Sequence, residues 1–167
     1  MMTTNQHLIR PIQPEDNRAM ADIVVAILQE FGCVGPGYAS SDPETHHPYE
    51  SYSADSSQYL VIADEHNTIV GGGGYSRLKG TTESDAICEL QKLYFKPELR
   101  GQGLGKQLLE SLIAHARQAD YKRMYLETVP QMKSAISLYQ KSGFQFLNGP
   151  LGNTGHHACT IHMQLML

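Results

Sequence analysis

The sequence has little of what covalent cross-links, zinc ribbons or membrane spans require. Its three cysteines, Cys33, Cys88 and Cys159, are odd in number and widely spaced, and no CxxC pair occurs. A disulfide framework is therefore not predicted. No apolar run approaches the length of a membrane span, and the polar N-terminus lacks the apolar segment of a signal peptide. We expect a cytoplasmic protein with reduced thiols and no membrane partner.

The sequence also has fewer positively charged than negatively charged residues. The chain has 13 Lys and Arg residues against 17 Asp and Glu residues, which gives a formal net charge of -4. This balance argues against a nucleic-acid partner. Apolar residues make up 41% of the chain and charged residues 18%, a composition typical of globular proteins. With 167 residues and no internal repeat, residues 1–167 are expected to form a single domain.

The apolar pattern predicts strands and helices that follow one another along the chain. Long connections inside compact domains are usually binding loops or lids, and residues 32–58, which are poor in apolar side chains, are interpreted in this way. The order of the elements predicts an α/β class with helices packed on a mixed sheet. Expected strands begin near residues 7, 59, 69, 86, 123, 144 and 159, and expected helices near residues 14, 104 and 134.

One expected strand, residues 86–95, changes its apolar phase along its length. Cys88 and Leu90 fall on even positions, whereas Leu93 and Phe95 fall on odd positions. Because strand side chains alternate between two faces, a slip of one residue predicts a β-bulge. The preceding strand contains four consecutive glycines, residues 71–74, which indicates that another group approaches its backbone closely.

A glycine-rich segment, residues 100–106, precedes the amphipathic helix that begins near residue 104. Such a turn presents backbone N–H groups and the positive end of the helix dipole, and its glycines let an anion approach the main chain. Arg100 and Lys106 add positive charge at either end. A Rossmann fingerprint would need glycine at Lys106, and a P-loop would need glycine at Arg100 and Ser or Thr at Gln107. The segment thus predicts a phosphate-binding site, but it matches neither the Rossmann fingerprint nor the P-loop.

The remaining pattern, R-x-x-G-x-G from Arg100 to Gly105, resembles the Q/R-x-x-G-x-G/A motif of the GNAT acetyltransferases. Residues 90–97 look like the central strand of that family, and residues 135–144 look like its A-x-x-L-Y-x-x-x-G-F helix. The resemblance extends in order over residues 8–146. It implies the GNAT fold, an α/β (α+β-like) arrangement of about seven strands in a mixed, mostly antiparallel sheet. Helices cover both faces, and the central strand is bulged and splayed from the next.

The resemblance implies an enzyme that moves the acetyl group of acetyl-CoA to a primary amine of a small molecule or peptide, by direct attack in a ternary complex and without a metal. One position departs from the family pattern, because Met132 stands where similar sequences often carry Asn. The cofactor-binding residues implied are Leu93, Tyr94, Phe95, Arg100, Gly101, Gln102, Gly103, Leu104, Gly105, Lys106, Tyr139 and Lys141.

Two residues are expected to be catalytic. Tyr139 stands where similar enzymes keep a tyrosine near the thioester sulfur, and its phenol would donate a proton to the thiolate. Its simpler interpretation is a packed aromatic of a short helix. Glu89 is the expected general base, because a charged residue in a buried strand requires a partner or a cleft. Glu127 and a chain of water molecules are the alternatives.

The acceptor side carries weaker signals. A loop at residues 152–157 is expected either to face the loop of residues 32–58 over the cleft or to be a plain surface turn. Zinc binding by the pairs His46-His47 and His156-His157 is disfavoured, because adjacent histidines rarely point the same way. A non-catalytic acyl-CoA sensor and a nucleotide-phosphate-binding module are the other functions considered, and a homodimer is left open. The expected substrate-binding residues are Phe31, Glu89, Gln91, Glu127 and His156.

Overall fold

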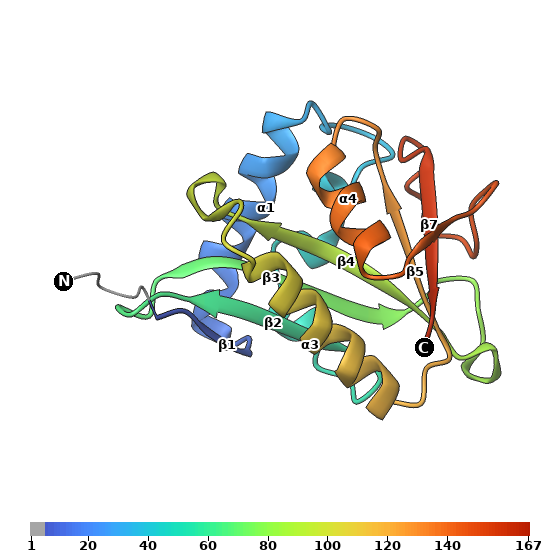
Figure 1. Cartoon of the computed structure of the whole chain (residues 1–167), viewed down its shortest axis with the longest axis horizontal. Helices are drawn as coiled ribbons and strands as arrows, with labels where there is room; N and C mark the ends of the chain where they lie inside the picture. The colour runs from blue at the N-terminus through green and yellow to red at the C-terminus, as the bar shows by residue number, and fades with distance from the viewer. Residues whose placement is uncertain (1–5) are drawn as a thin grey trace.

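The computed structural model describes residues 6–167, which form one seven-stranded sheet in the order β1-β2-β3-β4-β5-β7-β6 (Figure 1). All neighbouring strands pair antiparallel except β4 and β5, which are parallel. The predicted mixed, mostly antiparallel sheet is therefore confirmed. The strands are β1 (Leu8–Pro11), β2 (Gln58–Ala63), β3 (Ile69–Arg77), β4 (Ile87–Phe95), β5 (Arg123–Thr128), β6 (Gln145–Phe146) and β7 (Ile161–Met166).

The helices cover both faces of the sheet, as predicted. Figure 1 shows α3 in front of the sheet and α1 behind it. Strand β2 illustrates why two cores form, because Leu60 and Ile62 pack in the cluster that contains α3, whereas Tyr59 and Val61 pack in the cluster that contains α1. The helices are α1 (Asn17–Glu30), α2 (Pro48–Ser51), α3 (Leu104–Gln118) and α4 (Lys133–Lys141).

The predicted bulge lies in β4. On the neighbouring strand β3, Gly72 pairs with Tyr94 and Gly74 pairs with Gln91, so β4 contains one residue more than β3 over this stretch. Lys92 absorbs the extra residue with a left-handed backbone, φ 52°, a conformation that non-glycine residues seldom adopt. The bulge explains why the apolar phase changes between Leu90 and Leu93.

The glycine run in β3 is required by close packing on both sides of the strand. A Cβ on Gly74 would lie 2.6 Å from Tyr59 Cδ2 and 2.7 Å from the carbonyl oxygen of Gln58, and a Cβ on Gly73 would lie 2.7 Å from Leu93 Cδ1. Only glycine leaves room for these neighbours. The expected close approach to this strand is thus confirmed.

The parallel strands β4 and β5 separate after a short paired stretch. Pairing runs from Ile87 opposite Arg123 to Glu89 opposite Tyr125 and then stops, whereas β5 continues to pair with β7 up to Thr128. Figure 1 shows the two strands side by side at one end and well apart at the other. The gap between their separated ends is where the cavities of the site lie.

Among residues 6–167, no helix combines the length and the apolar composition needed to cross a bilayer.

Candidate active site

A cleft of about 730 Å³ opens at the separated ends of β4 and β5. It reaches from the first turn of α3, past the end of α1, to the face of α4. Its size is in the range of cavities that bind small molecules and cofactors. The lining residues include Leu93, Tyr94, Phe95, Arg100, Gly101, Gly103, Gly105, Lys106, Lys133, Leu138, Tyr139 and Lys141.

The glycine segment forms one end of this cleft. Gly101 and Gly103 have left-handed backbones, φ 80° and 78°, and Gly103 is the N-cap of α3. The first N–H groups of a helix have no partner within it and attract anions. A Cβ on Gly105 would lie 2.9 Å from the Phe95 ring, so glycine lets the helix start pack directly on β4. These features fit a pyrophosphate, and the apolar walls formed by Leu93 and Phe95 fit a pantetheine chain.

Not every predicted cofactor residue lines the cleft. Leu104 is buried in the core formed with α3, and Gln102 is exposed and donates from Nε2 to the carbonyl oxygen of Glu98. Lys133 lines the cleft and was missed, because the family motif begins only at Ala135. Its place at the start of α4 is the signal that could have found it.

Arg100 does not stand free at the cleft. Its guanidinium donates two hydrogen bonds of 2.8 Å to the Glu30 carboxylate and lies 5.6 Å from the centre of the Phe31 ring. The hydrogen bonds from Arg100 and its positive charge lower the pKa of the Glu30 carboxyl group. Phe31 lines the large cleft beside the expected phosphate-binding segment and is not part of the smaller cavity, where the other residues predicted to bind the acceptor lie.

Tyr139 comes from the last turn of α4 and lines the cleft, with 7% of its surface exposed. Its ring packs 5.7 Å from that of Phe144. Burial raises the pKa of Tyr139 above its usual value, which keeps the phenol protonated at neutral pH. The residue is thus both a packed aromatic and a protonated group at the cleft wall.

A second cavity of about 50 Å³ adjoins the cleft at β4 and β5. Glu89, Gln91, Glu127 and His156 line this cavity, so the structure brings together four of the five residues predicted to bind the acceptor. We call it the acceptor pocket after that prediction. The remaining wall is largely apolar and includes Leu28, Ala39, Val129, Cys33 and Cys159. The cleft and the acceptor pocket meet at six shared residues, Leu90, Lys92, Tyr94, Glu127, Thr128 and Met132.

Glu89 is a buried carboxylate, with 3% of its surface exposed. Gln91 Nε2 donates to Glu89 Oε2 over 2.9 Å. Burial raises the pKa of Glu89 to about 7, the Gln91 amide opposes this shift, and the charge of Glu127 adds to it. A carboxylate with a pKa near neutrality can take up and release a proton at physiological pH.

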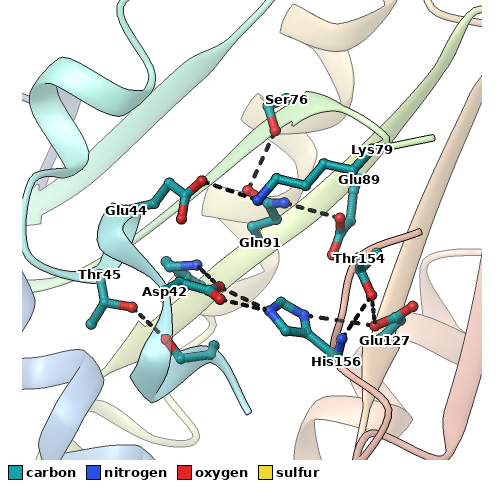
Figure 2. Close-up of polar contacts among 12 residues, drawn as sticks. Asp42, Glu44, Thr45, Ser76, Lys79, Glu89, Gln91, Glu127, Thr154 and His156 are labelled. Carbon is teal, nitrogen blue, oxygen red and sulfur yellow. Dashed lines mark hydrogen bonds and ion pairs between the residues drawn. The ribbon is translucent and has the colours of Figure 1, made fainter. Parts of the chain in front are cut away.

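Glu127 is held by two hydroxyl groups. Tyr125 donates to Oε1 over 2.7 Å, and Thr154 donates to Oε2 over 2.8 Å. Thr154 belongs to the loop of residues 152–157, so this contact places that loop over the acceptor pocket (Figure 2).

Asp42 connects the two loops that cover the acceptor pocket. His156 Nε2 lies 3.0 and 2.9 Å from the two carboxylate oxygens of Asp42, and Lys92 Nζ lies 2.9 Å from Asp42 Oδ2. Burial opposes ionisation of Asp42, yet the bonds from His156 and Lys92 hold its pKa at about 2. The hydrogen bond to Asp42 raises the pKa of His156 although burial opposes the shift. Figure 2 shows the His156 ring between Asp42 and Glu127.

The other histidines lie elsewhere. His46, His47 and His157 are exposed, and the His157 ring lies against Gly37. The four histidines considered for zinc therefore do not meet at one place.

The bulged and splayed strand and the helix start beside the cleft are features that the family resemblance implies. The chain belongs to the acetyltransferase (GNAT) family, whose model matches residues 22–144. It is 41% identical over 157 residues to the uncharacterized N-acetyltransferase YjgM of Escherichia coli, covering 93% of this chain and 92% of that protein.

Solved structures share the fold. An acetyltransferase of the GNAT family from Staphylococcus aureus aligns with a TM-score of 0.83 at 20% identity, covering 97% of this chain and 99% of that one. The acetyltransferase yncA from Salmonella typhimurium, solved with acetyl-CoA, aligns with a TM-score of 0.74 at 22% identity, covering 97% and 94%.

Proposed function

We propose that this protein transfers the acetyl group of acetyl-CoA to a primary amine of a small molecule or peptide, by direct attack in a ternary complex. The observation that supports this most is the meeting of two cavities at the separated ends of β4 and β5. Tyr139 lines the larger cavity and Glu89 lines the smaller one. A donor in the larger cavity and an acceptor in the smaller one can thus meet at the residues that the two cavities share.

In the proposed reaction, the acceptor amine loses a proton to Glu89, directly or through water, and its nitrogen attacks the thioester carbonyl carbon. A C–N bond forms and the carbonyl oxygen becomes an oxyanion, which a main-chain N–H near the bulge would stabilise. The C–S bond then breaks, the thiolate takes the phenolic proton of Tyr139, and the second proton released by the nitrogen as the amide forms returns to the phenolate through water. Glu127 is the alternative base, because it lines both cavities.

The amine acceptor is tested by measuring free thiol released from acetyl-CoA across a panel of amino acids, polyamines, aminoglycosides and peptides. We expect thiol release with a restricted set of primary amines. Acetyl-CoA binding without thiol release for every amine would instead support the alternative function, a non-catalytic sensor.

Replacement of Tyr139 by Phe tests the proposed acid. The variant keeps the packing of the ring and loses only the hydroxyl group, so we expect kcat to fall by roughly 10²-fold or more with little change in acetyl-CoA affinity. Steady-state kinetics and a direct binding titration separate the two quantities. Unchanged turnover would remove Tyr139 from the mechanism and leave it as a packed aromatic.

A further inference from the structure

The acceptor pocket holds a group of side chains whose chemistry goes beyond proton transfer. One ligating atom each from Glu89, Glu127 and His156 lies within 4.8 Å of the others. Atoms bound to one zinc ion at 2.0–2.2 Å lie at most about 4 Å apart, so small side-chain rotations would bring the three atoms to coordination distance. The ligands come from β4, β5 and the loop of residues 152–157, and two of them are anchored in the sheet.

The imidazole of His156 is already oriented for a ligand. Asp42 occupies its Nε2 with contacts of 2.9 and 3.0 Å, and Nδ1 faces Glu127 Oε2 at 3.7 Å. With Nε2 held by the Asp42 carboxylate, Nδ1 is the ring nitrogen that is placed to ligate a cation beside Glu127. This carboxylate–histidine arrangement is the usual support of a metal-bound histidine.

The carboxylates are supported in the same way. Gln91 binds Glu89 Oε2, and Tyr125 and Thr154 bind Glu127. Among residues 6–167, no hydrogen bond to Glu89 Oε1 is found, and this oxygen is not one of the buried side-chain atoms that lack a partner. It therefore faces the open space of the pocket, where a cation can reach it.

We propose that Glu89, Glu127 and His156 bind one divalent transition-metal ion in the acceptor pocket. One imidazole nitrogen with two carboxylates suits Zn²⁺ better than Mg²⁺, which prefers all-oxygen ligands and retains its water. Competition with the amine rests on the proposed function: where these side chains meet the acceptor, a bound Zn²⁺ competes with it.

The site is tested by calorimetric titration of chelator-treated protein with ZnCl₂, without acetyl-CoA and without an amine. We expect one Zn²⁺ per chain at this site. The variants His156→Gln and Glu127→Gln lose that binding step, and Asp42→Asn weakens it by roughly 10–100-fold, as expected for a residue that orients a ligand. His157→Gln is the matched control, because this exposed neighbour lies outside the cluster; it binds Zn²⁺ like the wild type.

Two measurements guard against loss of folding as the explanation. Thermal unfolding of each variant without metal shows whether it is folded. Co²⁺ added to the wild type, which needs no variant, is expected to give a visible absorption spectrum with one nitrogen ligand among oxygens, and excess Zn²⁺ should abolish it. Absence of a one-to-one binding step in the wild type, or equal binding by a folded His156→Gln variant, would overturn the proposal.

These outcomes do not depend on the proposed acetyl transfer. A failed metal titration leaves the amine panel and its result untouched. A failed amine panel, in turn, leaves a measured Zn²⁺ affinity standing.

Discussion

Glu89 is a carboxyl group whose protonation is set almost entirely by what surrounds it. Burial and the neighbouring Glu127 raise its pKa to about 7, and a general base acts only when it is ionised. We therefore expect kcat/KM for the amine to rise with pH through about 7 and to level off above it, wherever the amine itself does not titrate. A rate profile measured from pH 5 to 9 checks this dependence.

The variant Glu89→Gln removes that ionisation while keeping the shape of the side chain. We expect the rate to fall by roughly 10²–10⁴-fold and the rise near pH 7 to disappear. Glu65→Gln is the matched control, because Glu65 is exposed in the turn between β2 and β3; it should behave like the wild type. Full activity in Glu89→Gln with a loss in Glu127→Gln would transfer the role of base to Glu127.

Among single residues, the sequence predicted the expected reactive groups better than the side chains that form hydrogen bonds in the same pocket. Glu89 was conspicuous because a carboxylate is costly in a buried strand, and the structure places it in the acceptor pocket. Asp42, Lys92 and Thr154 were not predicted. Each is a common polar residue in a loop or bulge, and only the folded chain brings Asp42 to within 3.0 Å of His156, 114 positions away.

Strand β3 depends on the absence of side chains at its centre. In Gly74→Ala, the new Cβ would lie 2.7 Å from a backbone oxygen of β2, and a backbone cannot move aside without disturbing the ladder. We expect the free energy of unfolding to fall by about 1–3 kcal/mol, as measured by denaturant unfolding. The control Gly149→Ala places its Cβ in open space and should change stability by less than about 0.5 kcal/mol.

Periodicity predicted the elements where it extended over enough residues. The long helices and β2, β3, β4 and β5 follow their apolar patterns, and the slip between Leu90 and Leu93 located the bulge. Helix α2 was missed because its four residues are too short to show a helical period. The prediction that β4 separates from its neighbour rested on the family resemblance, because no local sequence pattern shows where two strands stop pairing.

Across the whole molecule, one ion pair connects two loops that are far apart in the chain. The pKa of Asp42 is about 2 in the folded protein against an ordinary value of 3.8. This difference stabilises the fold fully above the ordinary value, and the stabilisation disappears as the pH falls through 2. The raised pKa of His156 adds stability that is present at acidic pH and is lost as the pH rises through that raised value.

The variant Asp42→Asn should therefore lower the unfolding free energy at pH 6 by roughly 1–2 kcal/mol, allowing for solvent screening of a half-buried pair. The difference from the wild type should shrink as the pH approaches 2. Denaturant unfolding at several pH values measures it. Asp55→Asn, an exposed position in the same loop, is the control, and an equal loss there would show that the ion pair with His156 contributes nothing.

The bulge at Lys92 also has a consequence for how such a site can arise or be lost in a gene. Successive side chains of a strand point to opposite faces of the sheet. Two side chains therefore share a face only when they are an even number of positions apart. Loss of the single codon for Lys92 would restore regular alternation along β4 and turn Leu93, Tyr94 and Phe95 to the opposite faces. One deletion of three bases would thus remove the apolar wall that Leu93 and Phe95 give the cleft of about 730 Å³. No residue that lines the cleft would need to be substituted.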